Sequence, residues 1–154
     1  MIPLRLVIDT NVVLSAALEP EGMQRTVVLL ALTKPAQWYV SEAIVAEYAV
    51  VLAWPELKIR RGLRRQLLQL IEDRTHAVKP LGPESVTADP ADNMFVECAD
   101  AARGDYLITG NQRHFPAFWK STKIISPNEF LSIIAPHLLR EETLCPSAAF
   151  VLRT

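Results

Sequence analysis

The segment "LVIDTNVVLS" (residues 6–15) joins an apolar, largely β-branched run to a carboxylate, Asp9, and then to a polar Thr-Asn pair. An ionised carboxylate in a dry interior is costly unless it is paired or binds a cation. Asp9 is therefore either a helix cap at the exit of a buried strand or part of a functional site. The apolar residues on either side predict a strand at 4–8 and a short helix at 12–18, capped by Thr10 or Asn11.

Strand-like and helix-like segments alternate along the rest of the chain. Further short apolar runs predict strands at 37–40, 76–79, 106–109 and 123–126. Helical patterns occupy 22–34, 41–53, 57–74, 92–103 and 127–135, the last opened by a capping box at Ser126-Pro127-Asn128-Glu129. This alternation predicts an α/β fold of three layers, with a five-stranded parallel sheet, strand 4–8 at its centre and helices on both faces.

Composition places the chain among single-domain proteins with one core. Half of its 154 residues are apolar, and a formal net charge of −1 gives no overall attraction to nucleic acid. Cys98 and Cys145 form neither a disulfide framework nor a zinc-ligand set, and Cys98 falls on the apolar face of a helix. We expect one domain over residues 1–140, a C-terminal tail at 141–154, and a cytoplasmic location without signal peptide or membrane span.

Three carboxylates are placed to meet at one edge of this sheet. Ligands of open parallel sheets bind beyond the carboxyl ends of the strands. Asp9 ends the first strand, Glu47 lies in the helix after the second, and Asp92 opens the helix at 92–103. Asp89 precedes Asp92 in "DPAD" and is expected to support it.

Each of these acids also has a purely structural interpretation. Asp9 can cap the next helix, and Asp92 can be a first-turn acid that interacts with the helix dipole. Glu47 can be a partly exposed residue at the side of its helix, although helical spacing places it beside the apolar stripe that contains Ile44 and Val51.

Convergence of the three acids favours a metal site over these interpretations. Like charges in close proximity repel one another unless a cation neutralises them. A set made only of oxygen ligands favours Mg²⁺ or Mn²⁺ with several waters retained. Such an ion can activate water for phosphodiester hydrolysis, so the sequence predicts a metal-dependent hydrolase.

Four segments, in this order, resemble those of PIN-domain proteins: "VIDTNVVLSAAL" (7–18), "SEAIVAEY" (41–48), "DPADNMFVECADAARGDYLITGNQRHF" (89–115) and "IISPNEFL" (124–131). The resemblance covers residues 4–135. It is strongest to the bacterial branch that includes the toxin halves of VapBC-type toxin–antitoxin pairs.

The resemblance implies a PIN-like fold and a ribonuclease that depends on Mg²⁺ or Mn²⁺. It assigns catalytic and metal-binding roles to Asp9, Glu47 and Asp92, and supporting roles to Asn11 and Thr109. A fourth acid is typical after the fourth strand, where this chain has Asn111 instead. Asn111 offers only a neutral oxygen to a metal, which puts a second ion in doubt.

Two functions follow from the resemblance. The first is an endoribonuclease that acts as the toxin of a toxin–antitoxin pair, with a small antitoxin as partner. The second is a catalytically weak PIN domain that binds RNA or a protein partner, which Asn111 favours. A receiver domain shares the topology, but the third strand, in "HAVKPLG", is not followed by the aspartate that such a domain needs.

Basic and apolar clusters suggest contacts with RNA and with a second subunit. Candidate RNA-binding residues are Arg60, Arg61, Arg64, Arg65 and His114, although a solvated helix face and a surface histidine are the alternatives. The helix at 22–34 contains "VVLLAL", more apolar than a one-sided helix needs, so we expect a homodimer.

Overall fold

The apolar run that precedes Asp9 forms the central strand of the sheet. The computed structural model of the protein describes residues 3–83, 87 and 89–135. Its strands are β1 (Leu4–Ile8), β2 (Ala36–Val40), β3 (His76–Ala77), β4 (Tyr106–Ile108), β5 (Phe118–Trp119) and β6 (Thr122–Ile125). Its α-helices are α1 (Thr10–Leu18), α2 (Met23–Ala31), α3 (Glu42–Leu52), α4 (Arg61–Arg74), α5 (Pro90–Ala102) and α6 (Pro127–Ile134). Two short 3-10 helices are η1 (Pro55–Leu57) and η2 (Gln112–His114).

The sheet has the order β3-β2-β1-β4-β6-β5, in which the first five strands are parallel. Leu6 of β1 lies opposite Trp38 of β2 on one side and opposite Tyr106 of β4 on the other. Because β1 is covered on both faces, Leu6, Val7 and Ile8 are fully buried. The predicted central position of strand 4–8 is therefore confirmed.

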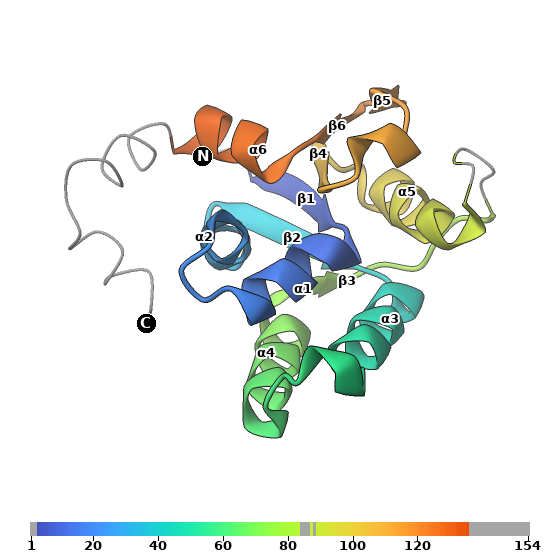
Figure 1. Ribbon diagram of the computed structural model, residues 1–154. Helices are drawn as coiled ribbons and strands as arrows, with labels where there is room; N and C mark the ends of the chain where they lie inside the picture. Colours follow the sequence, from blue (N-terminus) through green and yellow to red (C-terminus); the bar gives the residue numbers. More distant parts are fainter. Residues whose placement is uncertain (1–2, 84–86, 88, 136–154) are drawn as a thin grey trace.

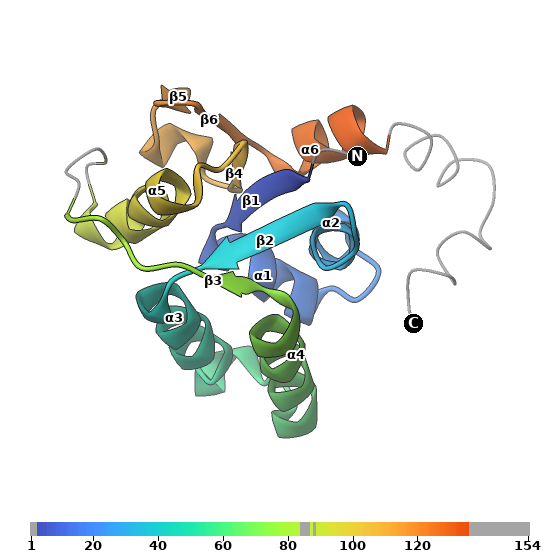
Figure 2. The ribbon, with the colours of Figure 1, turned by 180° about the vertical axis from the view of Figure 1, so that it is seen from behind.

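Helices cover the two faces of the sheet, as the alternation of elements predicts. Figure 1 and the reverse view in Figure 2 show α1 and α2 on one face and α5 on the other. The core joins both layers through β1, with Val12 and Val13 of α1 on one side and Phe95 and Val96 of α5 on the other. The three-layer α/β fold is thus confirmed.

The prediction of five strands was incomplete, because a sixth strand, β5, pairs antiparallel with β6 at the edge of the sheet. This strand is two residues long and is joined to β6 by a tight turn in which Lys120 has a positive φ of 54°. Two residues are too few to produce a recognisable pattern of alternating hydrophobicity.

Three predicted helix starts also differ from the structure, and one of them is that of the helix expected at 92–103, which begins at Pro90. The helix expected at 57–74 begins at Arg61, because Lys58 adopts a left-handed conformation with φ of 53° after η1. The helix expected at 12–18 begins at Thr10 with Asp9 at its N-cap position, so the prediction of Thr10 or Asn11 as cap was wrong. The Asp9 side chain makes no capping hydrogen bond.

Other local predictions are confirmed. Ser41 caps α3 by accepting a hydrogen bond from the backbone N–H of Ile44. Ser126 and Glu129 form the reciprocal capping box of α6, with Pro127 in the first turn. Cys98 is buried in the core, where desolvation raises the pKa of its thiol to about 12.

The expected domain boundary at residue 140, the tail at 141–154 and Cys145 lie outside the described residues. Within the described ranges, no helix combines the length and the apolar character needed to cross a lipid bilayer.

Candidate active site at the end of β1

Asp9 is a buried carboxylate at the exit of the central strand. Only 6% of its surface is exposed, and its backbone N–H donates to the carbonyl of Ile108 on β4 at 2.9 Å. Thr109, the residue after β4, donates its hydroxyl to Oδ2 of Asp9 at 2.7 Å. Because Thr109 is itself fully buried, the neighbouring strand holds the Asp9 carboxylate in one orientation.

Glu47 reaches the same region from α3. Its Oε2 accepts a hydrogen bond from the hydroxyl of Thr10, the residue that follows Asp9. The next residue, Tyr48, is fully buried and donates its hydroxyl to the carbonyl of Ile8. Two consecutive residues of α3 therefore bind the backbone and side chains around Asp9, which fixes α3 against the end of β1.

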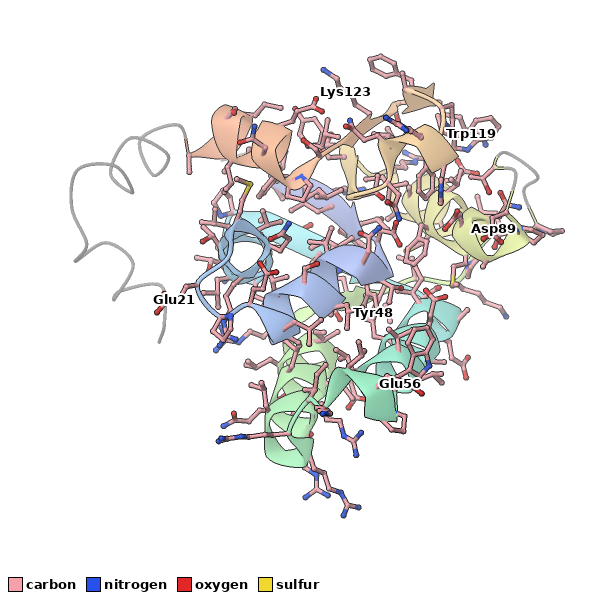
Figure 3. All side chains as sticks on the ribbon, viewed as in Figure 1. Glu21, Tyr48, Glu56, Asp89, Trp119 and Lys123 are labelled. Atoms are coloured by element: carbon pink, nitrogen blue, oxygen red, sulfur yellow. The ribbon has the colours of Figure 1, made fainter. Side chains whose placement is uncertain are left out.

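Asp92 belongs to the first turn of α5, where the helix dipole favours negative charge. Pro90 begins the helix, and Asp89 caps it by accepting from the backbone N–H of Ala91 at 3.0 Å. In Figure 3 the labelled Asp89 and Tyr48 mark the side of the molecule where the start of α5 lies next to α3, with which α5 is in contact.

One oxygen of Asp92 is buried without a hydrogen-bond partner. This atom, Oδ2, lies 3.3 Å from Nδ1 of His114 in η2, an ion pair when the imidazole is protonated. The His114 side chain is 54% exposed, whereas that of Asp92 is 16% exposed. Asp92 Oδ2 therefore makes no regular hydrogen bond among the described atoms, and its neighbour is the imidazole of His114.

The acids influence one another electrostatically. The pKa of Asp9 is raised from 3.8 to about 6: burial is the largest cause, the charges of Asp92 and Glu47 also raise it, and the Thr109 hydrogen bond lowers it. The pKa of Asp92 is also raised, mainly by burial and then by Asp89, while His114 lowers it. Asp89 therefore adds negative charge near Asp92 and supports it only through the helix cap.

The turn after β4 is tied to the start of α1. The side chain of Asn11 accepts from the backbone N–H of Gly110 at 3.1 Å, and the backbone N–H of Asn111 donates to Thr109 Oγ1 at 3.0 Å. A Cβ at position 110 would lie 3.4 Å from Asn11 Oδ1, an ordinary van der Waals contact, so it is the hydrogen bond that ties the turn to α1. Asn111 itself is exposed at the rim of the site.

The carboxylate oxygens of the site are suitable ligands for a hard cation, but they do not surround an ion on all sides. Its ligand atoms are carboxylate oxygens, and one of them is buried and unpartnered. Among the described residues, however, no three His, Cys, Asp or Glu side chains are grouped closely enough to hold an ion together. Mg²⁺ is usually bound by only one or two carboxylates and keeps several waters, so a group of three acids is not required for its binding.

The candidate RNA-binding residues are divided between two places. His114 lies at the acid site, paired with Asp92. The four arginines belong to the start of α4, which Figures 1 and 2 show on a different part of the molecule from α5. Arg60, Arg61 and Arg65 are exposed and Arg64 is half-buried.

The sequence analysis assigned no site role to Thr10 and Tyr48, whose hydroxyls donate to Glu47 and to the end of β1. Thr10 carried a signal, since a hydroxyl beside a suspected metal ligand is a suitable hydrogen-bond donor. Tyr48 carried none, because an aromatic residue on a helical stripe is explained by core packing alone.

Comparisons with known proteins agree with this arrangement. A family model described as "PIN domain" matches residues 5–113, a range that contains Asp9, Glu47, Asp92 and Asn111. No curated protein matches the chain. Among solved structures, one chain of VapBC2 from Rickettsia felis, crystallised with a DNA fragment from the promoter, is similar over 80% of this chain and 98% of its own length. The TM-score is 0.50 and the sequence identity 12%, so this likeness concerns the fold alone.

Proposed function

This chain belongs to the PIN-domain family, and from that premise we propose that it is an endoribonuclease dependent on Mg²⁺ or Mn²⁺. PIN domains are generally nucleases. The observation that carries the proposal is the buried Oδ2 of Asp92, which has no regular hydrogen bond and belongs to a carboxylate whose charge raises the pKa of the buried Asp9. Burial raises the pKa of both carboxylates, so a bound cation would stabilise their ionised forms.

In this proposal Asp9 and Asp92 would hold the ion, with Glu47 and Asn111 as further oxygen donors of the site. When bound, the ion supplies positive charge to the transition state of phosphodiester hydrolysis and lowers the pKa of water. Thr109 orients Asp9, and Thr10 orients Glu47 so that one carboxylate oxygen remains free to accept a proton. Asn11 holds the Gly110 turn close to the site.

RNA is the proposed substrate, and basic side chains are proposed to bind its phosphates. His114 is close enough to Asp92 to contact the scissile region when the imidazole is not paired. Arg60, Arg61, Arg64 and Arg65 form a second basic surface, together with a shallow cavity lined by Arg61, Arg64, Arg65, Leu68, Gln69 and Glu72. A bound RNA would release counterions there, which makes its affinity depend on salt.

The toxin role requires a partner that blocks the enzyme. We propose a small antitoxin protein whose apolar segment occupies the groove between α1, α2 and α4. Its apolar lining consists of Ala16, Ala17, Val28, Leu29, Leu32, Leu63, Leu67 and Leu70. Co-purification with the product of the neighbouring reading frame, lost on replacing Leu70 by Glu, is the expected result.

The direct test of the activity is cleavage of mixed single-stranded RNA by the purified protein. We expect cleavage with Mg²⁺ or Mn²⁺ and none with EDTA, because the acids cannot act without a cation between them. Restoration by added Mn²⁺ serves as the control for denaturation. Equal cleavage with and without EDTA would contradict the metal-dependent mechanism.

A second function deserves the same test, because Asn111 stands at the position where an acid is typical. In that alternative the chain is a weak or inactive PIN domain that binds RNA or a protein. RNA binding without cleavage under any of the metal conditions is the outcome that this alternative predicts.

A further inference from the structure

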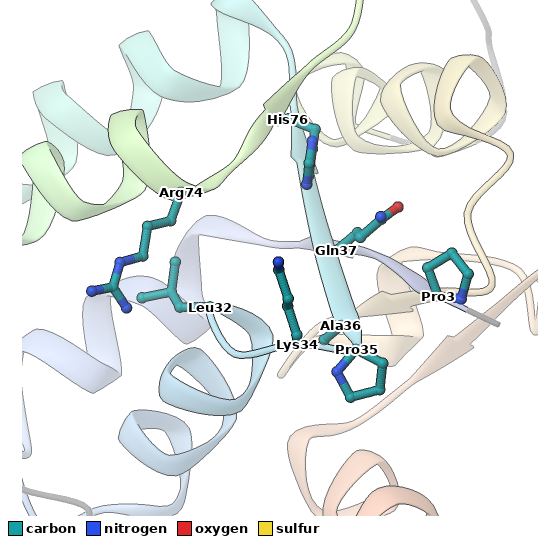
Figure 4. A pocket seen from close by; sticks show the side chains of 8 residues that line it. All are labelled: Pro3, Leu32, Lys34, Pro35, Ala36, Gln37, Arg74 and His76. Atoms are coloured by element: carbon teal, nitrogen blue, oxygen red, sulfur yellow. The ribbon is translucent and has the colours of Figure 1, made fainter. Parts of the chain in front are cut away.

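A cleft opens at the other end of the strands, away from the acid site. It has a volume of about 880 Å³ and is lined by Pro3, Leu32, Lys34, Pro35, Ala36, Gln37, Arg74 and His76. In Figure 4, Arg74, Leu32 and Lys34 lie on the α4 side of β2, and Gln37 and Pro3 lie on its other side. Pro3 precedes β1 and Asp9 follows it, so about 20 Å of extended chain separates the cleft from the acid site.

The ionisable side chains that line the cleft are all basic. Lys34 comes just before β2, Arg74 ends α4, and His76 begins β3, so three separate elements bring basic side chains to its walls. Lys34, Arg74 and His76 are all exposed to solvent. None of the eight lining residues, all within the described part of the chain, is acidic. The wall is therefore complementary to an anion.

Two lining residues of the cleft, Gln37 and His76, are in contact with Tyr39, which does not itself line the cleft. The hydroxyl of Tyr39 donates to Oε1 of Gln37 at 2.9 Å, which leaves the Gln37 NH₂ as the donor available to a ligand. The rings of Tyr39 and His76 are 5.2 Å apart with an interplanar angle of 33°, and the Arg5 guanidinium lies 5.9 Å from the centre of the Tyr39 ring. Hydrogen-bond donors beside ring faces are the groups that recognise nucleobases.

We infer that this cleft is a binding site for a nucleotide, with Lys34 and Arg74 on the phosphate and with Gln37 and His76 beside the base. Guanidinium groups bind phosphate oxygens through two parallel hydrogen bonds, and an ammonium group adds a point charge. The nucleotide is either free or one unit of an RNA chain, since both present the same phosphate and base. The site is independent of the acids at the opposite edge and does not rest on the proposed nuclease activity.

The test is a titration of the ¹⁵N-labelled protein, in EDTA, followed by two-dimensional NMR. The probes are uridine monophosphate, inorganic phosphate and a six-nucleotide RNA. We expect saturable shifts of the backbone amides of Ala36, Gln37 and His76. Lys34→Gln and Arg74→Gln should each weaken binding about threefold or more, whereas Lys123→Gln, an exposed lysine on β6, should not.

The probes distinguish the two sources of the nucleotide. Tighter binding of uridine monophosphate than of the six-nucleotide RNA identifies a free nucleotide, and tighter binding of the RNA, or shifts with RNA alone, identify the chain. Equal affinity for inorganic phosphate and uridine monophosphate would overturn the nucleotide assignment. Absence of shifts at these amides, or binding unchanged in both charge variants, would overturn the site itself. RNA cleavage, measured separately with Mn²⁺, reports on the acid site, so failure of one proposal leaves the other testable.

Discussion

Among the acids of the candidate site, Asp9 is the one whose ionised form is most disfavoured by burial. Its carboxylate is buried, receives one hydrogen bond from Thr109, and lies within the influence of two further acids, Asp92 and Glu47. A carboxyl with a pKa of about 6 binds a proton in the folded state over a pH range in which the unfolded chain, with a value of 3.8, has lost it. Asp9 therefore stabilises the fold below pH 4 relative to neutral pH, and this contribution is lost as the pH rises to about 6.

The first prediction is that Asp9→Asn stabilises the metal-free protein at pH 7. The rise in pKa is equivalent to roughly 3 kcal/mol at most, and the new amide NH₂ offsets part of it, so we expect a gain of about 1–2 kcal/mol. Thermal unfolding in EDTA at pH 7 measures this gain, which should vanish below pH 4, where the wild-type carboxyl is protonated in both states. The control is Asp73→Asn, which alters an exposed acid of α4. A lower melting temperature for Asp9→Asn than for wild type at pH 7 would contradict the assignment.

The second prediction concerns Thr109, which links Asp9 to the Asn111 turn. Thr109→Val removes both hydrogen bonds from a buried position and should cost about 1–3 kcal/mol of stability. It should also weaken Mn²⁺ binding about tenfold, since the ionised Asp9 loses its donor. Calorimetric titration with Mn²⁺ measures the affinity, and Thr109→Ser, which keeps the hydroxyl, should remain near wild type. Equal Mn²⁺ affinity in the Val and Ser variants would show that the hydroxyl does not support the site.

The elements of the fold differ in how far their sequence predicts them. The β-branched run of β1 and the Ser126 capping box carry strong local signals, and both are confirmed. The start of α4 and strand β5 were missed because they depend on single backbone conformations, at Lys58 and Lys120, that side-chain patterns do not specify. Local chemistry determines long elements, whereas short edge elements are determined by the partner they pair with.

The candidate site was predictable to the extent that it follows from topology. Asp9 follows β1, Asp92 lies in the first turn of α5, and Glu47 lies within the helix after β2, which are positions that a single sequence can indicate. The hydrogen bond from Thr10 to Glu47 and the proximity of His114 to Asp92 depend on how α3 and η2 pack. A single sequence does not indicate that packing. Their catalytic and metal-binding roles stay predictions.

The third prediction concerns the turn that joins β4 to η2. Asn111→Asp places a fourth carboxylate at the rim of the acid site, where it should tighten Mn²⁺ binding about threefold to tenfold. Because Asn111 is exposed and its backbone N–H makes the turn's hydrogen bond, the fold should be unchanged. Calorimetry with Mn²⁺ and RNA cleavage are the measurements. Cleavage by this variant together with an inactive wild type would favour the binding-module alternative, and an unchanged Mn²⁺ affinity would exclude residue 111 from the site.

Two candidate sites lie at opposite ends of the strands of one sheet. The acids lie where the parallel strands end, and the basic cleft lies where β1 and β2 begin. The apolar run in α2 that suggested a dimer is largely absorbed by the core, since Val27, Val28 and Ala31 are buried. Large exposed apolar side chains instead occur at the end of α3 and just beyond it, where Val50 is 61% and Trp54 is 47% exposed.

The fourth prediction is therefore a homodimer in which the outer surface of α3 is covered. Exposed apolar surface of this kind usually marks an interface. Light scattering at micromolar concentration should give twice the monomer mass of 17.2 kDa, and Val50→Glu should return the monomer. Leu81→Glu, which changes an apolar residue that is 81% exposed in a loop, is the matched control. A monomeric wild type would rule the dimer out.

The central claim is that Asp92 and Asp9 hold a cation that serves RNA cleavage, and the rate of cleavage by Asp92→Asn tests it most directly. The substitution keeps the size of the side chain and removes the charge from the buried Oδ2 position. Because metal stabilisation of the transition state is worth several kcal/mol, and 1.4 kcal/mol is about tenfold in rate, we predict a loss of at least about 100-fold with Mn²⁺ present. Asp73→Asn should cleave at the wild-type rate. Equal rates for wild type and Asp92→Asn would contradict the account.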